Sequence, residues 1–325
     1  MSNSFNKRVV FIDYAKALCI FLMIVGHWTK NEILLTYIYS FHMPTLFIVS
    51  GYLYKPRFFL NTIISFAIPY IIFSLFNLIV ELLLGITSTD SIFLPDFIFR
   101  IVHYRYGLGN SLFIGDWFLW ALIGLRFIFG DIPLLKPLRK HYLIIAIVCS
   151  IYMNFESFLI SIDTIFHGYY IGRMIPSLLF FCFGFYLKDI QWNPVSVTPR
   201  TIIFMILAFI VLPILNNAHG INDNDFGYSY CLYAFIAILT TLLLFTLSSK
   251  LPPIEFVKTI SRGTLVVLGS HIPILHILQY SLPETVSFLF PFITIIFCYL
   301  IIVICEKYFP VLLGKSPVIS FTKNH

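Results

Sequence analysis

The chain is built from about ten apolar segments, separated by short polar connections. A helix needs ~20 apolar residues to cross the ~30 Å hydrocarbon core of a bilayer. Backbone polar groups in lipid must be paired internally, so segments of this length favour helices over barrel strands. The sequence therefore predicts an all-α, polytopic membrane helix bundle with about ten transmembrane helices in a single domain, residues 1–325. The segments run near residues 10–28, 36–54, 58–84, 113–130, 141–155, 171–187, 201–215, 229–247, 263–281 and 286–305.

Composition excludes a soluble protein. Charged residues make up 11% of the chain and hydrophobic residues 59%, whereas soluble domains carry ~25% charged residues. The cysteines lie in the apolar segments without CxxC spacing, which indicates small packing residues. The histidines lack the spacing of metal ligands, so we expect no metal site and no bound cofactor.

The basic residues predict the orientation in the membrane. With a cytoplasmic N-terminus, the inner loops hold 15 of the 21 Lys and Arg residues, and the outer loops hold Lys30, Arg100 and Arg105. This positive-inside asymmetry predicts that both termini are cytoplasmic. The net charge of +6 then faces anionic lipid headgroups, and no nucleic-acid partner is expected.

The first apolar segment carries ionisable residues within "DYAKALCIFLMIVGHW", residues 13–28. Lys16 and His27 are eleven residues apart, which places them on one helix face, roughly 16 Å apart along the axis. Asp13 lies one turn before Lys16 and could pair with it. The alternative is that Lys16 snorkels to the inner headgroups and His27 marks the outer interface.

A second histidine opens the next apolar segment, "SFHMPTLFIVSGY". The connection between the first two segments is short, so they should be antiparallel neighbours with His27 and His42 at similar depth. Ionisable residues inside a membrane are costly and are candidates for function; the alternative is a structural pair bonded to backbone carbonyls. Other polar residues fall at the outer level or near mid-membrane: Glu81, Asp116, Trp117, Arg173, Ser270 and His271.

These motifs resemble one known family. Lys16, ten residues, His27 and then "SFHMPTLFIVSGYL" are similar to the first two helices of the acyltransferase 3 family of integral membrane acyltransferases. "GDWFLW" at 115–120 and "ISRGTLVVLGSHIP" at 260–273 resemble its fourth and ninth helices. Between the second and third segments, where many members carry several basic residues, this chain has only Lys55 and Arg57.

The resemblance implies a bacterial cytoplasmic-membrane enzyme that O-acylates, usually O-acetylates, a cell-surface or lipid-linked sugar, with acetyl-CoA as the donor. His27 and His42 are then expected to be catalytic, with His27 as a general base or as a nucleophile that forms an acyl-histidine. The rival hypothesis is a secondary transporter in which Lys16, His27 and His42 form a relay. The residues expected to bind substrate are Lys16, Asp13, Lys55, Arg57, Trp117, Arg173 and His271.

Overall fold

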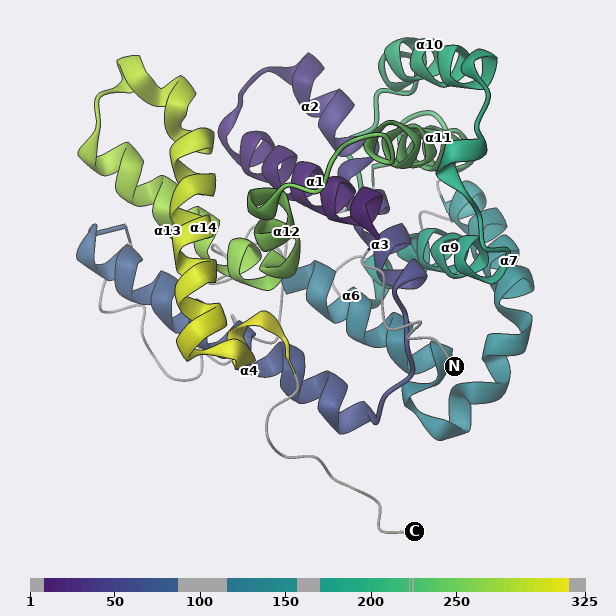
Figure 1. Ribbon diagram of the computed structural model, residues 1–325, viewed down its shortest axis with the longest axis horizontal. Helices are drawn as coiled ribbons and strands as arrows, with labels where there is room; N and C mark the ends of the chain where they lie inside the picture. The colour runs from purple at the N-terminus through teal and green to yellow at the C-terminus, as the bar shows by residue number, and fades with distance from the viewer. Residues whose placement is uncertain (1–8, 87–115, 157–169, 222, 224, 316–325) are drawn as a thin grey trace.

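The computed structural model describes residues 9–86, 116–156, 170–221, 223 and 225–315 (Figure 1). Regular structure within these residues is helical, apart from an isolated bridge between Gly220 and Asp225. Each of the predicted apolar segments falls on a helix. The main helices are α1 Val10–Trp28, α2 Glu32–Tyr39, α3 His42–Tyr52, α4 Phe59–Leu83, α6 Asp116–Arg126, α7 Tyr142–Glu156, α9 Tyr170–Asp189, α10 Pro199–Asn216, α11 Tyr230–Ser248, α12 Glu255–Arg262, α13 Thr264–Ser281 and α14 Phe290–Tyr308.

The membrane spans are only partly settled by these helices. Within the described residues, seven helical stretches are long and apolar enough to cross a membrane, and an eighth is added if the bent α6–α7 pair forms one span. The count of ten and the cytoplasmic placement of both termini therefore stay predictions. The N-terminal residues 1–8 and the long connection 87–115 lie outside the described part of the chain.

The second predicted segment, 36–54, is two helices rather than one. Asn31 caps the N-terminus of α2 by accepting a hydrogen bond from the backbone of Leu34, and the helix is interrupted at Phe41, whose φ of −146° is not helical. Pro44 explains the break, because its ring would clash with the carbonyl of Ser40 and it has no N–H to donate there. The interruption places His42 at the first position of α3.

Helices α3 and α9 pack backbone against backbone. A Cβ atom added at Gly51 would lie 1.9 Å from the carbonyl oxygen of Phe181, and one added at Gly184 would lie 1.8 Å from that of Ile48. Small residues permit this approach between membrane helices. The two glycines thus hold the helix that begins with His42 tightly against α9.

Helices α6 and α7 meet at an 89° bend. A π-helical turn, η2 Phe127–Asp131, follows α6, and a 3-10 helix, η3 Pro133–His141, leads into α7. Gly130 has a φ of 121°, which a residue with a side chain rarely adopts, and Pro133 prevents the helix from continuing. The bend leaves the Asp131 carboxylate buried at the end of η2.

Helix α1 lies at the centre of the bundle (Figure 1). It packs against α3 and α11 on one side and against α12, α13 and α14 on the other. Its polar residues therefore meet side chains that are far apart in the sequence.

Candidate functional site

Three histidines from three helices come together where α1 ends. The His27 ring, at the end of α1, lies 5.2 Å from the His271 ring of α13, centroid to centroid. His42, at the start of α3, is also within electrostatic range of His27. His271 is near the middle of α13, so the C-terminal end of α1 reaches the interior of the bundle. We call His27, His42 and His271 the histidine cluster.

Backbone carbonyls fix the tautomers of two of these rings. His42 donates its Nδ1–H to the carbonyl of Ile38 at 2.7 Å, and His271 donates its Nδ1–H to that of Val267 at 2.8 Å. A carbonyl only accepts hydrogen bonds, so in each neutral ring Nδ1 carries the proton and Nε2 carries the lone pair. The Nε2 atom of His271 is buried and has no hydrogen-bond partner in the described structure. It is available to accept a proton or a hydrogen bond.

The three rings differ in access. His42 and His271 are buried, with 4% and 0% of their surface exposed, whereas the His27 side chain is exposed. Of the three rings, His27 is therefore the one that presents exposed surface.

Tyr39 joins α2 to the histidine cluster and was not anticipated from the sequence. Its ring centroid lies 5.4 Å from that of His42, and its hydroxyl donates to the carbonyl of Gly26 at 3.2 Å, next to His27. A Cβ at Gly26 would lie 3.2 Å from the Tyr39 ring, so the contact is close. The only sequence signal for this role is an aromatic residue one helical turn before His42.

Asp13 and Lys16 lie on α1, closer to the opposite end of the bundle. Asp13 is buried and accepts a hydrogen bond from the Ser261 hydroxyl at 2.7 Å, which ties α1 to α12. Lys16, one turn further along, is partly buried. Asp13 therefore anchors a neighbouring helix, a role that the expected pairing with Lys16 did not include.

Trp117 lies on α6 and Arg173 on α9, the helix that packs against α3. Trp117 is buried and packs against the rings of Phe47 and Phe118. Arg173 is 2% exposed near the start of α9. The side chain of Asp116 lies outside the described part of the structure.

Arg57 joins a polar cluster that includes residues not singled out in the sequence. The Asp131 carboxylate accepts hydrogen bonds from the Arg57 backbone N–H at 3.1 Å and from Arg126 Nε at 2.9 Å. Thr62 donates to Asp131 at 2.5 Å and accepts from Arg57 Nε at 2.9 Å. We call Arg57, Thr62, Arg126 and Asp131 the arginine–aspartate cluster. In the sequence, this cluster is indicated only by Arg126 and Asp131, two charged residues five positions apart at the end of an apolar segment.

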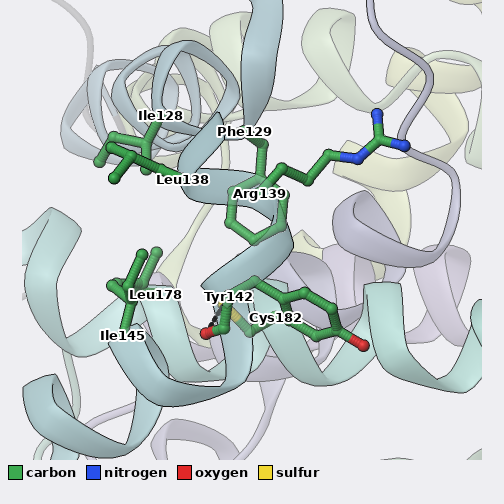
Figure 2. A pocket seen from close by; sticks show the side chains of 8 residues that line it. All are labelled: Ile128, Phe129, Leu138, Arg139, Tyr142, Ile145, Leu178 and Cys182. Atoms are coloured by element: carbon green, nitrogen blue, oxygen red, sulfur yellow. Dashed lines mark hydrogen bonds between the residues drawn. The ribbon is translucent and has the colours of Figure 1, made fainter. Parts of the chain in front are cut away.

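Further cations surround this cluster. Lys188 donates to the carbonyl of Tyr54 at 2.6 Å, and Arg126 donates to that of Lys55 at 3.0 Å. Arg139 lies over the Phe185 ring at 5.4 Å. In Figure 2 the Arg139 guanidinium points away from the apolar side chains that line a small pocket between η2, η3, α7 and α9. The Arg139 charge therefore lies at one edge of an otherwise largely apolar contact.

A larger apolar groove of about 320 Å³ lies between α1, α12 and α14. The described side chains that line it are all apolar, so it suits a hydrocarbon chain better than a reacting group. In the described residues, no group of three His, Cys, Asp or Glu side chains is placed to hold a metal ion. The groove is lined by Ala17, Phe21, Phe256, Ile260, Phe292, Ile295 and Ile296.

The sequence matches the model of one known family. The sequence profile Acyl_transf_3, described as an acyltransferase domain, matches residues 9–306. Neither the curated proteins nor the solved structures include a significant match. The profile covers nearly the whole chain, including all three histidines and the arginine–aspartate cluster. The chain therefore belongs to the acyltransferase 3 family.

Proposed function

We propose that this membrane acyltransferase moves an acyl group, most simply acetyl, from cytoplasmic acyl-CoA to a hydroxyl of a cell-surface or lipid-linked sugar. The membership of the family supports acyl transfer within a membrane. The observation that carries the choice of site is the contact between exposed His27 and buried His271, whose free Nε2 lies in the same cluster. A bacterial cytoplasmic membrane would supply the donor on one side and the glycan on the other.

In the base mechanism, His27 takes the proton of the acceptor hydroxyl while the oxygen attacks the thioester carbonyl carbon. The bond from carbon to sulfur then breaks, and the CoA thiolate takes the proton from the His27 imidazolium. An imidazole suits both steps because it titrates near neutral pH. The fixed, neutral rings of His42 and His271 would keep the His27 ring in one orientation throughout.

In the second mechanism, His27 itself attacks the thioester. An acyl-histidine forms as CoA leaves, and the sugar hydroxyl then displaces the histidine. This order allows the donor to leave before the acceptor binds. Both routes use the same exposed ring.

The donor is proposed to enter from the cytoplasmic side. Lys16, Lys55 and Arg57 are the cations expected to meet its phosphates. Lys16 lies roughly 16 Å along α1 from His27, given ~1.5 Å of rise per residue. The phosphates would thus stay near the inner rim while the thioester reaches the histidine cluster.

The test is acyl transfer by purified protein in liposomes with labelled acetyl-CoA and candidate glycan acceptors. His27→Ala should lower the rate by ~10²–10⁴-fold, because it removes the proton-transfer group. His141→Ala is the matched control, since His141 is exposed on η3 and distant in sequence from the cluster. Transport of substrate without CoA release would instead favour the transporter hypothesis, and a normal rate for His27→Ala would contradict the assignment of this residue.

A further inference from the structure

The Asp131 carboxylate is at the centre of the arginine–aspartate cluster. Its side chain has no exposed surface, and it accepts hydrogen bonds from the Tyr54 hydroxyl at 3.1 Å, from Thr62 and from Arg126. A buried carboxylate is costly unless it is paired and fully hydrogen-bonded. Asp131 meets this condition by drawing together the α3–α4 connection, α4 and the end of α6.

The cluster nevertheless carries an excess of positive charge. Two guanidinium groups lie near a single carboxylate: Arg126 pairs with Asp131 directly, and the Arg57 guanidinium is linked to it through the Thr62 hydroxyl. The pKa of the Arg57 guanidinium is lowered to about 10, first because it is partly buried and second because Arg126 lies nearby, and Asp131 opposes the shift only in part. Lys55, Lys188 and Arg139 add to the positive field around this cluster. An added anion would relieve the repulsion between these groups.

Each arginine also retains hydrogen-bond donors that the cluster does not use. Arg57 donates through Nε to Thr62 and through Nη1 to Ser65, and Arg126 donates through Nε and Nη2. Among the described residues, no acceptor contacts Nη2 of Arg57 or Nη1 of Arg126. Guanidinium groups held in fixed positions bind phosphate more specifically than mobile lysines do.

We infer that Asp131 is a positioning residue that holds Arg57 and Arg126 side by side to bind a phosphate of the acyl-CoA donor. Thr62 completes the arrangement, because its hydroxyl links the Arg57 guanidinium to the Asp131 carboxylate. The inference rests on the proposed function for the identity of the ligand. It adds Arg126, Thr62 and Asp131 to the donor side of the protein, where the sequence indicated only Lys55 and Arg57.

The experiment is equilibrium binding of CoA to purified protein in phosphatidylcholine nanodiscs, which needs no turnover. Arg57→Gln and Arg126→Gln should each weaken CoA binding by about 10–100-fold, the usual size for a lost hydrogen bond to a charged group. Arg126→Lys should fall between Gln and the native residue, because it keeps the charge and loses the planar fork. Arg200→Gln is the control, since it removes the same charge from an exposed position at the start of α10 and should leave the affinity unchanged.

Asp131→Asn separates positioning from simple charge attraction. If only net charge mattered, this variant would bind CoA more tightly, because it removes a negative group. If Asp131 positions the arginines, binding weakens, and the uncharged change Thr62→Val weakens it as well. Thr62→Val also keeps the test open if Asp131→Asn does not fold.

Three outcomes would overturn the inference. The first is native CoA affinity in both Gln variants, and the second is tighter CoA binding by Asp131→Asn. The third is that the Gln variants bind CoA normally but lose binding of phosphatidylglycerol that is added to the nanodiscs. The last would assign the cluster to a lipid headgroup. Failure of the proposed function gives a different result. If the protein binds CoA through the cluster but transfers no acyl group, the donor site stands and the proposed reaction is wrong.

Discussion

The histidine cluster and the arginine–aspartate cluster satisfy their buried polar groups in opposite ways. His42 and His271 each bond to a carbonyl four residues earlier in their own helix. Asp131, by contrast, is bonded to Arg57 and Thr62, which lie 74 and 69 residues away in the chain. The polar bonds of the first cluster stay within single helices, whereas the second joins a local ion pair between Arg126 and Asp131 to long-range hydrogen bonds from Arg57 and Thr62.

This difference has an energetic reason. A neutral imidazole in the bundle needs one partner for its N–H, and the helix backbone supplies it. A carboxylate needs several donors at once, and breaking a buried ion pair by removing one partner costs ~3–5 kcal/mol. The histidine cluster can therefore tolerate an unpartnered Nε2 that is free for chemistry, whereas Asp131 serves to hold other groups in place.

The largest expected effect on acyl transfer comes from the histidine cluster, and it tests whether the three histidines act as one unit. His42→Ala and His271→Ala should each lower acyl transfer by ~10²-fold or more, within the range for groups that support proton transfer. Combining either with His27→Ala should cost far less than the product of the single losses, because residues that act as one unit are not additive. CoA affinity should stay native in all of these variants.

The measurement is the transfer rate and the CoA affinity at matched membrane levels of each protein. Multiplicative losses would show that the three histidines act independently. A loss of CoA binding would show that the two clusters are not separate in function.

An intermediate effect is expected at Lys16, which lies on α1 about three helical turns from His27. Lys16→Met keeps most of the apolar stem and removes the charge, so the KM for acetyl-CoA should rise by about tenfold or more. Lys16→Arg should retain most of the activity. Steady-state kinetics with varied acetyl-CoA measure both, and equal kinetics for the Met variant would favour the snorkelling alternative.

The smallest effect on activity, and a direct test of sidedness, comes from single cysteines in a Cys-less background. Tyr228 is 86% exposed in the connection between α10 and α11, and Arg200 is exposed at the other end of α10. Tyr228→Cys should react with an impermeant thiol reagent in intact cells, and Arg200→Cys only after permeabilisation. Both are surface changes that should alter stability by no more than ~0.5 kcal/mol. The reverse labelling pattern would place the clusters on the opposite sides of the membrane.

Packing between helices links the two regions. Gly51 and Gly184 hold α3 against α9, and α3 carries His42 at its first residue and leads to Tyr54 and Arg57 just beyond its end. The position of one short helix therefore affects both clusters. Neither glycine was singled out in the sequence, because a small residue in an apolar segment does not reveal its neighbour.

The sequence by itself determined the helical class, the place of each apolar segment and the histidines worth attention, because these follow from local patterns. Apolar runs predict helices, and an imidazole in such a run is unusual enough to notice. Pro44 was visible too, but its effect, the break that puts His42 at the start of α3, required the backbone.

Only the tertiary structure decided which polar residues meet. The contact between His27 and His271 joins residues 244 positions apart. The hydrogen bond from the Arg57 backbone N–H to Asp131 depends on the bend after α6. No local pattern encodes such pairs, because the helix backbone fixes only the neighbours three and four residues away. The partners across helices are set by packing, and in this protein packing forms both the proposed catalytic site and the proposed site for the donor.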